Sequence, residues 1–282
     1  MKTEQKRWTS GNNWESISDN NLKEQANLVF VFGGRNALSD KSRYEEIKNF
    51  YPNAHILLGS TSGEIMDIEV SDDTIIATAA FFEHTKIETI KLNISDVANS
   101  YEAGTKLASS LSKEKLVNVF VLSEGLKVNG SELVKGLNEH VPSGVGVTGG
   151  LAGDGAKFEK TIVGINASPD TGNIVAIGFY GEKLKIGYGS MGGWDPFGPE
   201  RKVTKSNANV LYEMDGQPAL ALYKKYLGDQ AKDLPGSGLL FPLSIRTSPG
   251  AEPIVRTILA VDEAAQSLTF AGDIPVGALA NL

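Results

Sequence analysis

Three consecutive hydroxyl-bearing residues follow an apolar run in the first quarter of the chain. Residues 57–67, LLGSTSGEIMD, place Ser60, Thr61 and Ser62 between two glycines, with Glu64 directly after the second glycine. Hydroxyls and glycine amides can donate to a carboxylate, and a glutamate can accept from an ammonium group. Small-molecule sites usually carry a few such convergent polar groups. The segment therefore predicts a polar ligand site, and the alternative is a turn capped by serine and threonine.

The same loop has a partial likeness to a hydrolase motif. G-S-T-S-G is similar to the G-x-S-x-G nucleophile elbow, but its central residue is Thr61 and the residues after it predict a turn and a strand instead of a helix. A hydroxyl nucleophile also needs a base. The three histidines, His55, His84 and His140, are scattered along the chain. We therefore expect no enzyme, and a hydrolase that uses residues 60–62 is the alternative.

A second loop is rich in glycine, with six glycines among residues 144–155. Gly144, Gly146 and Gly149 fit the spacing G-x-G-x-x-G of a dinucleotide-binding turn. That motif needs a helix after the glycines and an acidic residue about 20 positions further on. Turn formers and then a strand pattern follow here, and the acidic position falls near Ile165. The spacing does not predict a nucleotide site.

The second loop instead predicts a tight turn in which missing side chains let the backbone approach other groups closely. Gly149 and Gly150 suit contact with a ligand, and Asp154 can accept from an ammonium group. A loop that merely reverses the chain is an equally good interpretation. For Asp154, as for Glu64, the alternative role is to cap a turn.

A lone arginine interrupts an apolar run near the C-terminus, IVRTILAV, at Arg256. A buried charge must be paired, and an arginine can hold a carboxylate through two parallel hydrogen bonds. The alternative is a side chain that points outward from a half-exposed strand. We expect no catalytic residue, no metal and no cofactor. The predicted ligand-binding residues are Ser60, Thr61, Ser62, Gly63, Glu64, Gly149, Gly150, Asp154 and Arg256.

The elements that must position these loops alternate between strand and helix in the first half of the chain. Apolar runs predict strands, and the run at residues 39–51 predicts a helix with Ser39 as its N-cap. A second helix is expected to open at Ser95 and a third to cover SELVKGLNEHV. The predicted strands cover residues 27–34, 54–59, 74–82, 86–94 and 116–123, the third and fourth of them joined as a hairpin.

The pattern then changes to antiparallel sheet. Three strand-like segments over residues 157–190, separated by turn residues, predict a meander. Residues 192–200, GGWDPFGPE, predict a boundary, and beyond it we expect a helix over QPALALYKKYLG, a hairpin over residues 241–262 and no closing strand. The predicted fold class is α/β (α+β mixed), a mixed sheet with β-α-β units followed by an antiparallel meander, plus a partial second domain.

Composition excludes several classes of protein. The 282 residues carry a net charge of −7, which argues against a nucleic-acid partner held through its phosphates. Without cysteine, the chain has no disulfide, thiol nucleophile or cysteine-ligated zinc. The N-terminus lacks the apolar core of a signal peptide and the apolar runs are far shorter than a membrane span. We expect a soluble, cytoplasmic protein without a membrane partner.

Six segments, in order, resemble the FIST domain of F-box and intracellular signal-transduction proteins. They are GSTSGEI, LSEGLKVNGSELVKGL, VTGGLAGDGAKFEKTIV, YEMDGQPALALYKKYLG, FPLSI and IVRTILAVDE with LTFAGDIPVG. The resemblance starts at about residue 25 and implies three regions. These are a polar N-terminal segment (1–24), a FIST N-terminal-like domain (25–205) and the start of a FIST C-terminal-like domain (206–282). The family often has a cysteine where this chain has Gly59, and its C-terminal part normally continues further, so the chain is expected to be a fragment or a short member.

The resemblance implies a sensory module and not an enzyme, with amino acids proposed as ligands. On this basis the chain is expected to bind a small polar, amino-acid-like ligand and to relay its presence to a signalling protein. A scaffold or adaptor that binds no ligand is the remaining alternative, besides the hydrolase. If both glycine-rich loops line one site, the sensor hypothesis gains support.

Overall fold

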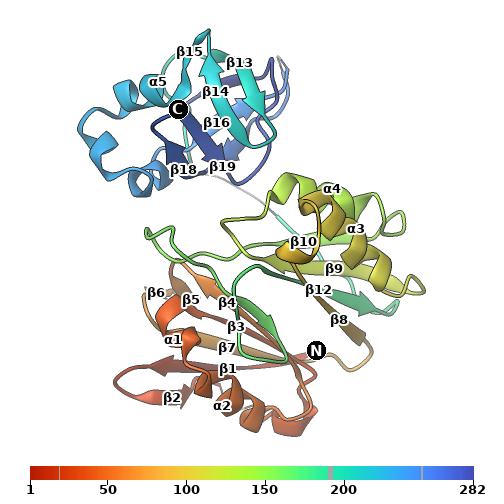
Figure 1. Ribbon diagram of the computed structural model, residues 1–282. Coiled ribbons are helices and arrows are strands. Elements are labelled where there is room, and N and C mark those ends of the chain that lie inside the picture. Colours follow the sequence, from red (N-terminus) through yellow and green to blue (C-terminus); the bar gives the residue numbers. More distant parts are fainter. Residues whose placement is uncertain (19, 190–192, 249) are drawn as a thin grey trace. The chain divides into compact units, whose positions relative to one another are not determined.

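The computed structural model describes residues 1–18, 20–189, 193–248 and 250–282. The chain divides into two compact units. Unit 1 comprises Met1–Val128, Leu133–Gly155 and Glu159–Tyr188, and unit 2 comprises Asn129–Glu132, Ala156–Phe158 and Gly189–Leu282. Helices and strands alternate in unit 1 and strands dominate unit 2 (Figure 1), which confirms the mixed α/β class. None of the described helices is both long enough and apolar enough to cross a membrane.

The first sheet of unit 1 has the strand order β11-β4-β3-β7-β1-β2. Only β3 and β4 are parallel, joined by α1 and α2, which makes the first predicted β-α-β unit. Residues 1–24 contribute β1, β2 and the start of a short 3-10 helix, η1 (Lys23–Gln25). The bounds are β1 Lys2–Thr9, β2 Asn13–Ser16, β3 Leu28–Gly34, α1 Arg35–Ser39, α2 Ser42–Phe50, β4 His55–Thr61, β7 Ile75–Phe81 and β11 Val163–Ile165.

The second sheet of unit 1 has the order β10-β9-β12-β8. Here β9 and β10 are parallel and are joined by α4, so the second β-α-β unit is also present. The short strands β5 (Glu64–Met66) and β6 (Glu69–Ser71) form a hairpin of their own. The remaining bounds are β8 Lys86–Asn93, η2 Ile94–Asp96, α3 Ser100–Ser110, β9 Leu116–Ser123, α4 Gly130–Asn138, β10 Gly146–Leu151 and β12 Asn173–Tyr180.

Two helix starts differ from the sequence predictions. Ser39 ends α1, where its hydroxyl donates to the Arg35 carbonyl, and α2 begins at Ser42 without a side-chain cap. Ser95 lies in the 3-10 helix η2, and α3 begins at Ser100. Its N-cap is Asn99, whose side chain accepts from the Glu102 amide. Asparagine is as good an N-cap as serine, so a serine alone does not fix the start of a helix.

Several strands pair with partners other than those expected. β7 and β8 belong to different sheets, so they do not form a hairpin. β11 pairs with β4, whereas β12 lies between β8 and β9, so the expected meander is divided between the two sheets. All eight residues of β12 are buried, as a central strand requires. The third expected strand is absent from residues 183–189, and Ser190 lies outside the described residues, as does Gly192 at the start of the predicted boundary.

The two sheets of unit 1 pack face to face, and helices cover their outer faces (Figure 1). Between the sheets, Phe30 and Phe120 meet edge to face, with ring centroids 5.3 Å apart. A Cβ on Gly59 would overlap the Leu122 side chain of the opposite sheet, so the sheets approach closely there. α1 and α2 pack on the first sheet, and α3 and α4 on the second. Unit 1 is therefore a four-layer α/β/β/α arrangement.

Unit 2 is an antiparallel sheet, in the order β17-β16-β20-β13-β14-β19-β18 with β15 paired to β14, and α5 packs on its core. The helix after the predicted boundary is confirmed, and the predicted hairpin over residues 241–262 is present in part as β16–β17, because residues 258–262 form β18 and pair with β19 instead. A closing strand, β20, is present, because Leu279–Asn281 pairs with both β13 and β16. The bounds are β13 Arg201–Asn207, β14 Val210–Met214, β15 Gln217–Pro218, α5 Ala219–Leu227, η3 Gly228–Asp233, η4 Gly236–Leu239, β16 Leu243–Arg246, β17 Ile254–Arg256, β18 Ile258–Asp262, β19 Ser267–Phe270 and β20 Leu279–Asn281.

Candidate functional site

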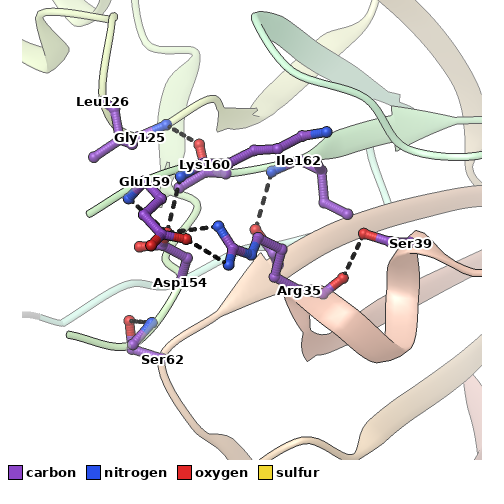
Figure 2. Close-up of polar contacts among 12 residues, drawn as sticks. Arg35, Ser39, Ser62, Gly125, Leu126, Asp154, Glu159, Lys160 and Ile162 are labelled. Carbon is purple, nitrogen blue, oxygen red and sulfur yellow. Dashed lines mark hydrogen bonds and ion pairs between the residues drawn. The ribbon is translucent and has the colours of Figure 1, made fainter. Parts of the chain in front are cut away.

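The carboxyl ends of the two parallel strand pairs of unit 1 meet at one place (Figure 2). The loop after β4 and the loop after β10 are joined directly, because the Gly153 amide donates to the Ser60 carbonyl at 2.9 Å. The two loops picked out by the sequence are thus neighbours, as a shared site requires. Ligands of α/β sheets commonly bind beyond the carboxyl ends of parallel strands. We call this cluster of loops the loop site.

Ser60 and Thr61 hold the first loop in place. Ser60 is 1% exposed, and its Oγ accepts from the Ile162 amide at 3.0 Å, so this hydroxyl joins β4 to the segment before β11. The Thr61 hydroxyl donates to Glu64 at 2.5 Å. Both hydroxyls therefore have protein partners that fix the shape of the loop.

Ser62 is the exposed hydroxyl of the loop. Its Oγ accepts from the Gly155 amide at 3.2 Å, and a hydroxyl that accepts in this way keeps its proton for donation to a ligand. A Cβ on Gly153 would overlap Ser62 Oγ, which explains why a glycine stands at that position. Gly63 has φ +151, a conformation that favours glycine.

Glu64 is a buried clamp at the base of the hairpin that follows the loop. It is 2% exposed. One carboxylate oxygen accepts from the Thr61 hydroxyl, and the other accepts from the amide and the hydroxyl of Thr74, each at 3.0 Å. The carboxylate therefore ties the chain before β5 to the chain after β6.

Asp154 organises the second loop and holds an arginine. Its Oδ2 accepts from the amides of Glu159 and Lys160 at 3.0 and 2.9 Å, and it lies 3.4 Å from Nη1 of Arg35. Nη2 of Arg35 contacts Glu159 at 2.9 Å (Figure 2). The Asp154 side chain is 3% exposed, but that of Glu159 is 64% exposed. Arg35 thus lies between one buried and one solvent-facing carboxylate.

A second buried glutamate, Glu124, follows β9. It is 2% exposed and accepts from the amides of Leu126 and Lys127, at 2.9 and 2.6 Å, and from the Thr161 hydroxyl, at 2.9 Å. Thr161 Oγ1 in turn accepts from the Gly125 amide at 2.8 Å. Neither this network nor Arg35 was predicted from the sequence. Their place in the sequence could have indicated both residues, because Arg35 and Glu124 are the first charged residues after the parallel strands β3 and β9.

Comparison with known protein families agrees with this architecture. Residues 27–217 match the FIST N domain, and residues 219–282 match the FIST C domain. The chain belongs to the FIST family. FIST domains are sensory domains of signal transduction. None of the curated proteins compared with the sequence matches it. All the residues of the loop site described so far lie in the FIST N domain.

Three glycines of the second loop, Gly146, Gly149 and Gly150, are part of strand β10 in this FIST N domain. Gly146 and Gly149 lie in β10, and no helix follows them, in agreement with the exclusion of a dinucleotide turn. Gly149 has φ +143, and a Cβ there would overlap the Val121 carbonyl oxygen of β9. Gly150 is exposed, and a Cβ there would meet nothing within 4 Å. Of the two glycines predicted to contact a ligand, Gly150 has the open surroundings.

Arg256 is the one predicted ligand residue that belongs to unit 2. Its Nε donates to the Asp273 carbonyl at 3.2 Å and its Nη2 to the Ser131 hydroxyl at 3.3 Å. Burial lowers the pKa of Arg256, and the charge of Asp273 opposes that shift. The arginine is half-buried and has partners within unit 2, so its charge is accommodated without a ligand. A ligand contact at Arg256 stays a prediction.

The histidines contact other parts of the FIST N domain. His55 Nδ1 contacts the Asn166 side chain at 3.1 Å, and His140 Nδ1 contacts the Gly136 carbonyl at 2.9 Å. His84 lies 3.8 Å from Glu83. Within the described residues, none of the recorded histidine contacts is to the hydroxyls of residues 60–62, and no group of three potential ligands could hold a metal ion.

Proposed function

We propose that this FIST protein senses a small polar ligand with a carboxylate group, of the amino-acid class, at the loop site, and relays its presence to a signalling protein. The proposal depends mainly on the ion pairs and the exposure of Arg35. Its side chain is 16% exposed, and its guanidinium is shared between buried Asp154 and exposed Glu159. An arginine in this setting can exchange one carboxylate for another.

The Glu159 carboxylate is the one that a ligand would replace. Exposed ion pairs contribute only about 0–1 kcal/mol, so breaking the contact between Arg35 and Glu159 costs little. Asp154 is held by two backbone amides and stays in place as the countercharge. A ligand carboxylate can then bind the guanidinium through two parallel hydrogen bonds.

The loop site also contains hydrogen-bond donors that a polar ligand could use. The Ser62 hydroxyl is exposed, the Gly63 amide follows it in the chain, and Gly150 is exposed in β10. Ser60, Thr61 and Glu64 support these donors by fixing the loop, so their effect on a ligand is indirect in this proposal. A polar ligand would gain a carboxylate clamp from Arg35 and an additional donor from Ser62.

The proposed function is non-enzymatic. A hydroxyl nucleophile needs an adjacent base to remove its proton. The Thr61 proton is directed to Glu64, but that carboxylate already accepts two further hydrogen bonds from Thr74 and is fully buried in the clamp. Such a glutamate supports the fold of the loop. A hydrolase would require Ser62 to have a base, and its recorded partner is an amide donor.

A thermal-shift screen against amino acids and small carboxylates tests the proposal. A ligand at about 100 times its Kd adds roughly 2.7 kcal/mol of stability, which is easily measured. The shift should disappear in Arg35→Gln and weaken in Ser62→Ala. Arg43→Gln is the matched control, since Arg43 also lies between two carboxylates, Asp40 and Glu46, with a side chain 15% exposed.

Three results would count against the proposal. A shift that Arg35→Gln leaves unchanged would move the ligand to another site. A folded protein that responds to no member of the screen would favour a scaffold. Turnover of an ester or amide substrate that is lost in Ser62→Ala would favour the hydrolase.

A further inference from the structure

The hairpin β5–β6 exposes an unusual group of aliphatic side chains. Ile65 is 70% exposed, Ile68 is 92% exposed and Val70 is 72% exposed. Ile65 and Val70 are direct partners across the hairpin, so they lie on one face, and Ile68 is in the turn between the strands. Single exposed aliphatic residues are ordinary, but a contiguous group on one short element indicates an interaction surface.

The opposite face of this hairpin shows that the orientation is fixed by the fold. Glu64 and Met66 alternate with Ile65 along β5, and both are buried, at 2% and 9% exposure. The carboxylate of Glu64 is buried while the isoleucine beside it faces solvent, the reverse of the usual pattern for a surface strand. The clamp from Glu64 to Thr61 and Thr74 holds both ends of the hairpin in this orientation.

Four acidic residues lie close to the aliphatic group in the sequence. Asp67, Glu69, Asp72 and Asp73 lie within or directly after the hairpin, and no lysine or arginine occurs between Ser62 and Thr85. Within the described part of the chain, Glu69 is the one of these four carboxylates with a recorded ion pair, to Arg7 at 3.1 Å. Glu69 lies on the face of Met66, opposite to Ile65 and Val70, so the hairpin combines an aliphatic face with an excess of negative charge from Asp67, Asp72 and Asp73.

We propose that the β5–β6 hairpin is a docking surface for a protein that presents an apolar groove bordered by lysine and arginine. Charge complementarity favours this occupant, because like charges placed side by side oppose association. A second copy of the chain would bring the same carboxylates together, and an anionic membrane surface would repel them. The docking surface is argued independently of the proposed function, although Ile65 lies only three positions after Ser62 of the loop site.

The test identifies the occupant and then measures its affinity. A photo-crosslinking amino acid is placed at position 68 of the full chain in its native cells, with position 276 as the control, where Val276 is 63% exposed in unit 2. The protein crosslinked through position 68 is purified, and its Kd is measured. Ile65→Ser and Ile68→Ser should each weaken binding by about tenfold or more, Val276→Ser should not, and added salt should weaken binding.

Each other outcome overturns the docking surface. The first is that no crosslink forms at position 68, and the second is that the crosslink is to a second copy of the chain or to lipid. The third is that the Kd of the partner does not change with the isoleucine substitutions or with salt. The ligand-induced thermal shift is measured on Ile68→Ser in parallel. If that shift persists while partner binding is lost, the two sites are separate, and if no ligand shift exists in any variant, the sensor proposal fails while the docking surface stands.

Discussion

Two kinds of carboxylate occupy the loop site, and the protein holds them in opposite ways. Glu64 and Glu124 are buried and each accepts three hydrogen bonds from neighbouring loops. Glu159 lies at the same site but is mostly exposed and contacts only Arg35 among its recorded side-chain partners in the described residues. The first kind sets the shape of the loops, and the second can exchange with a solute. Under the proposed function both kinds are needed, because the buried carboxylates keep the loops in place while the Glu159 contact is exchanged for the ligand.

The largest expected effect is on stability, from removal of a buried glutamate. Glu124→Ala leaves the amides of Leu126 and Lys127 and the Thr161 hydroxyl without their acceptor. Unsatisfied buried donors cost about 1–3 kcal/mol each when solvent cannot reach them. We expect a loss of about 2–4 kcal/mol in urea unfolding. The exposed Glu45→Ala is the control, with a change within about 0.5 kcal/mol. A loss below about 1 kcal/mol would contradict the structural role of Glu124.

The next effect separates two glycines of the same site. A Cβ on Gly125 would overlap the Ala152 carbonyl oxygen, whereas one on Gly150 would meet nothing within 4 Å. Gly125→Ala should cost about 1–3 kcal/mol, the usual cost of overpacking, because a backbone atom cannot move aside. Gly150→Ala should change the free energy of unfolding by less than about 0.5 kcal/mol. The free energy of unfolding is measured in urea for both variants. Equal losses would show that the Ala152 carbonyl can move away from an added Cβ at position 125, which would contradict the tight packing of these loops.

Glu88 offers an intermediate case, since it is accessible yet has several partners. Its contacts with Lys86, Tyr180 and Ser112 lower its pKa to about 2. A lowered pKa stabilises the folded state above the ordinary pKa of glutamate, and this contribution is lost as the pH falls from about 4.5 to about 2. Glu88→Gln should therefore be less stable than wild type at pH 7, by up to about 1 kcal/mol. The difference in unfolding free energy should shrink in acid, and a difference that grows in acid would contradict the assignment.

The smallest stability effect, paired with a gain in ligand affinity, is expected for Glu159→Gln. The variant loses one exposed ion pair, so its stability should change by less than about 0.5 kcal/mol. Arg35 no longer has a competing carboxylate, and the ligand found by the screen should bind up to about fivefold more tightly by titration calorimetry, the equivalent of one exposed pair. Weaker binding would show that Glu159 contacts the ligand more than it competes with it.

The sequence predicted the local structure well and the pairing of strands less well. The two β-α-β units and the glycine loops follow from local apolar runs and turn residues. That β7 and β8 enter different sheets does not follow, because alternation identifies a strand without identifying its partner. The partner of a strand depends on contacts between residues far apart in the sequence. One example is the hydrogen bond from the Ile162 amide to Ser60, which helps to place β11 beside β4.

Among the residues of the loop site, the hydroxyl loop and Asp154 were predicted because their types are grouped in the sequence. Arg35 and Glu124 were missed because each is a single charged residue among 27 basic and 34 acidic ones. Their importance comes from topology, since parallel strands end at the same edge and bring the next residue of each strand together. The roles of the predicted residues in ligand contact stay predictions.

The pairing of β11 with β4 has a consequence for how the chain is synthesised. β4 ends at Thr61 and β11 begins at Val163, so the first sheet stays incomplete while the whole β9-α4-β10 segment leaves the ribosome. At roughly 5–20 residues per second this delay lasts about 5–20 s. During that time the edge of β4 is open to pairing with other chains. We therefore expect the first sheet to be completed late in translation, and nascent chains halted before Val163 are the ones that we expect to need a chaperone.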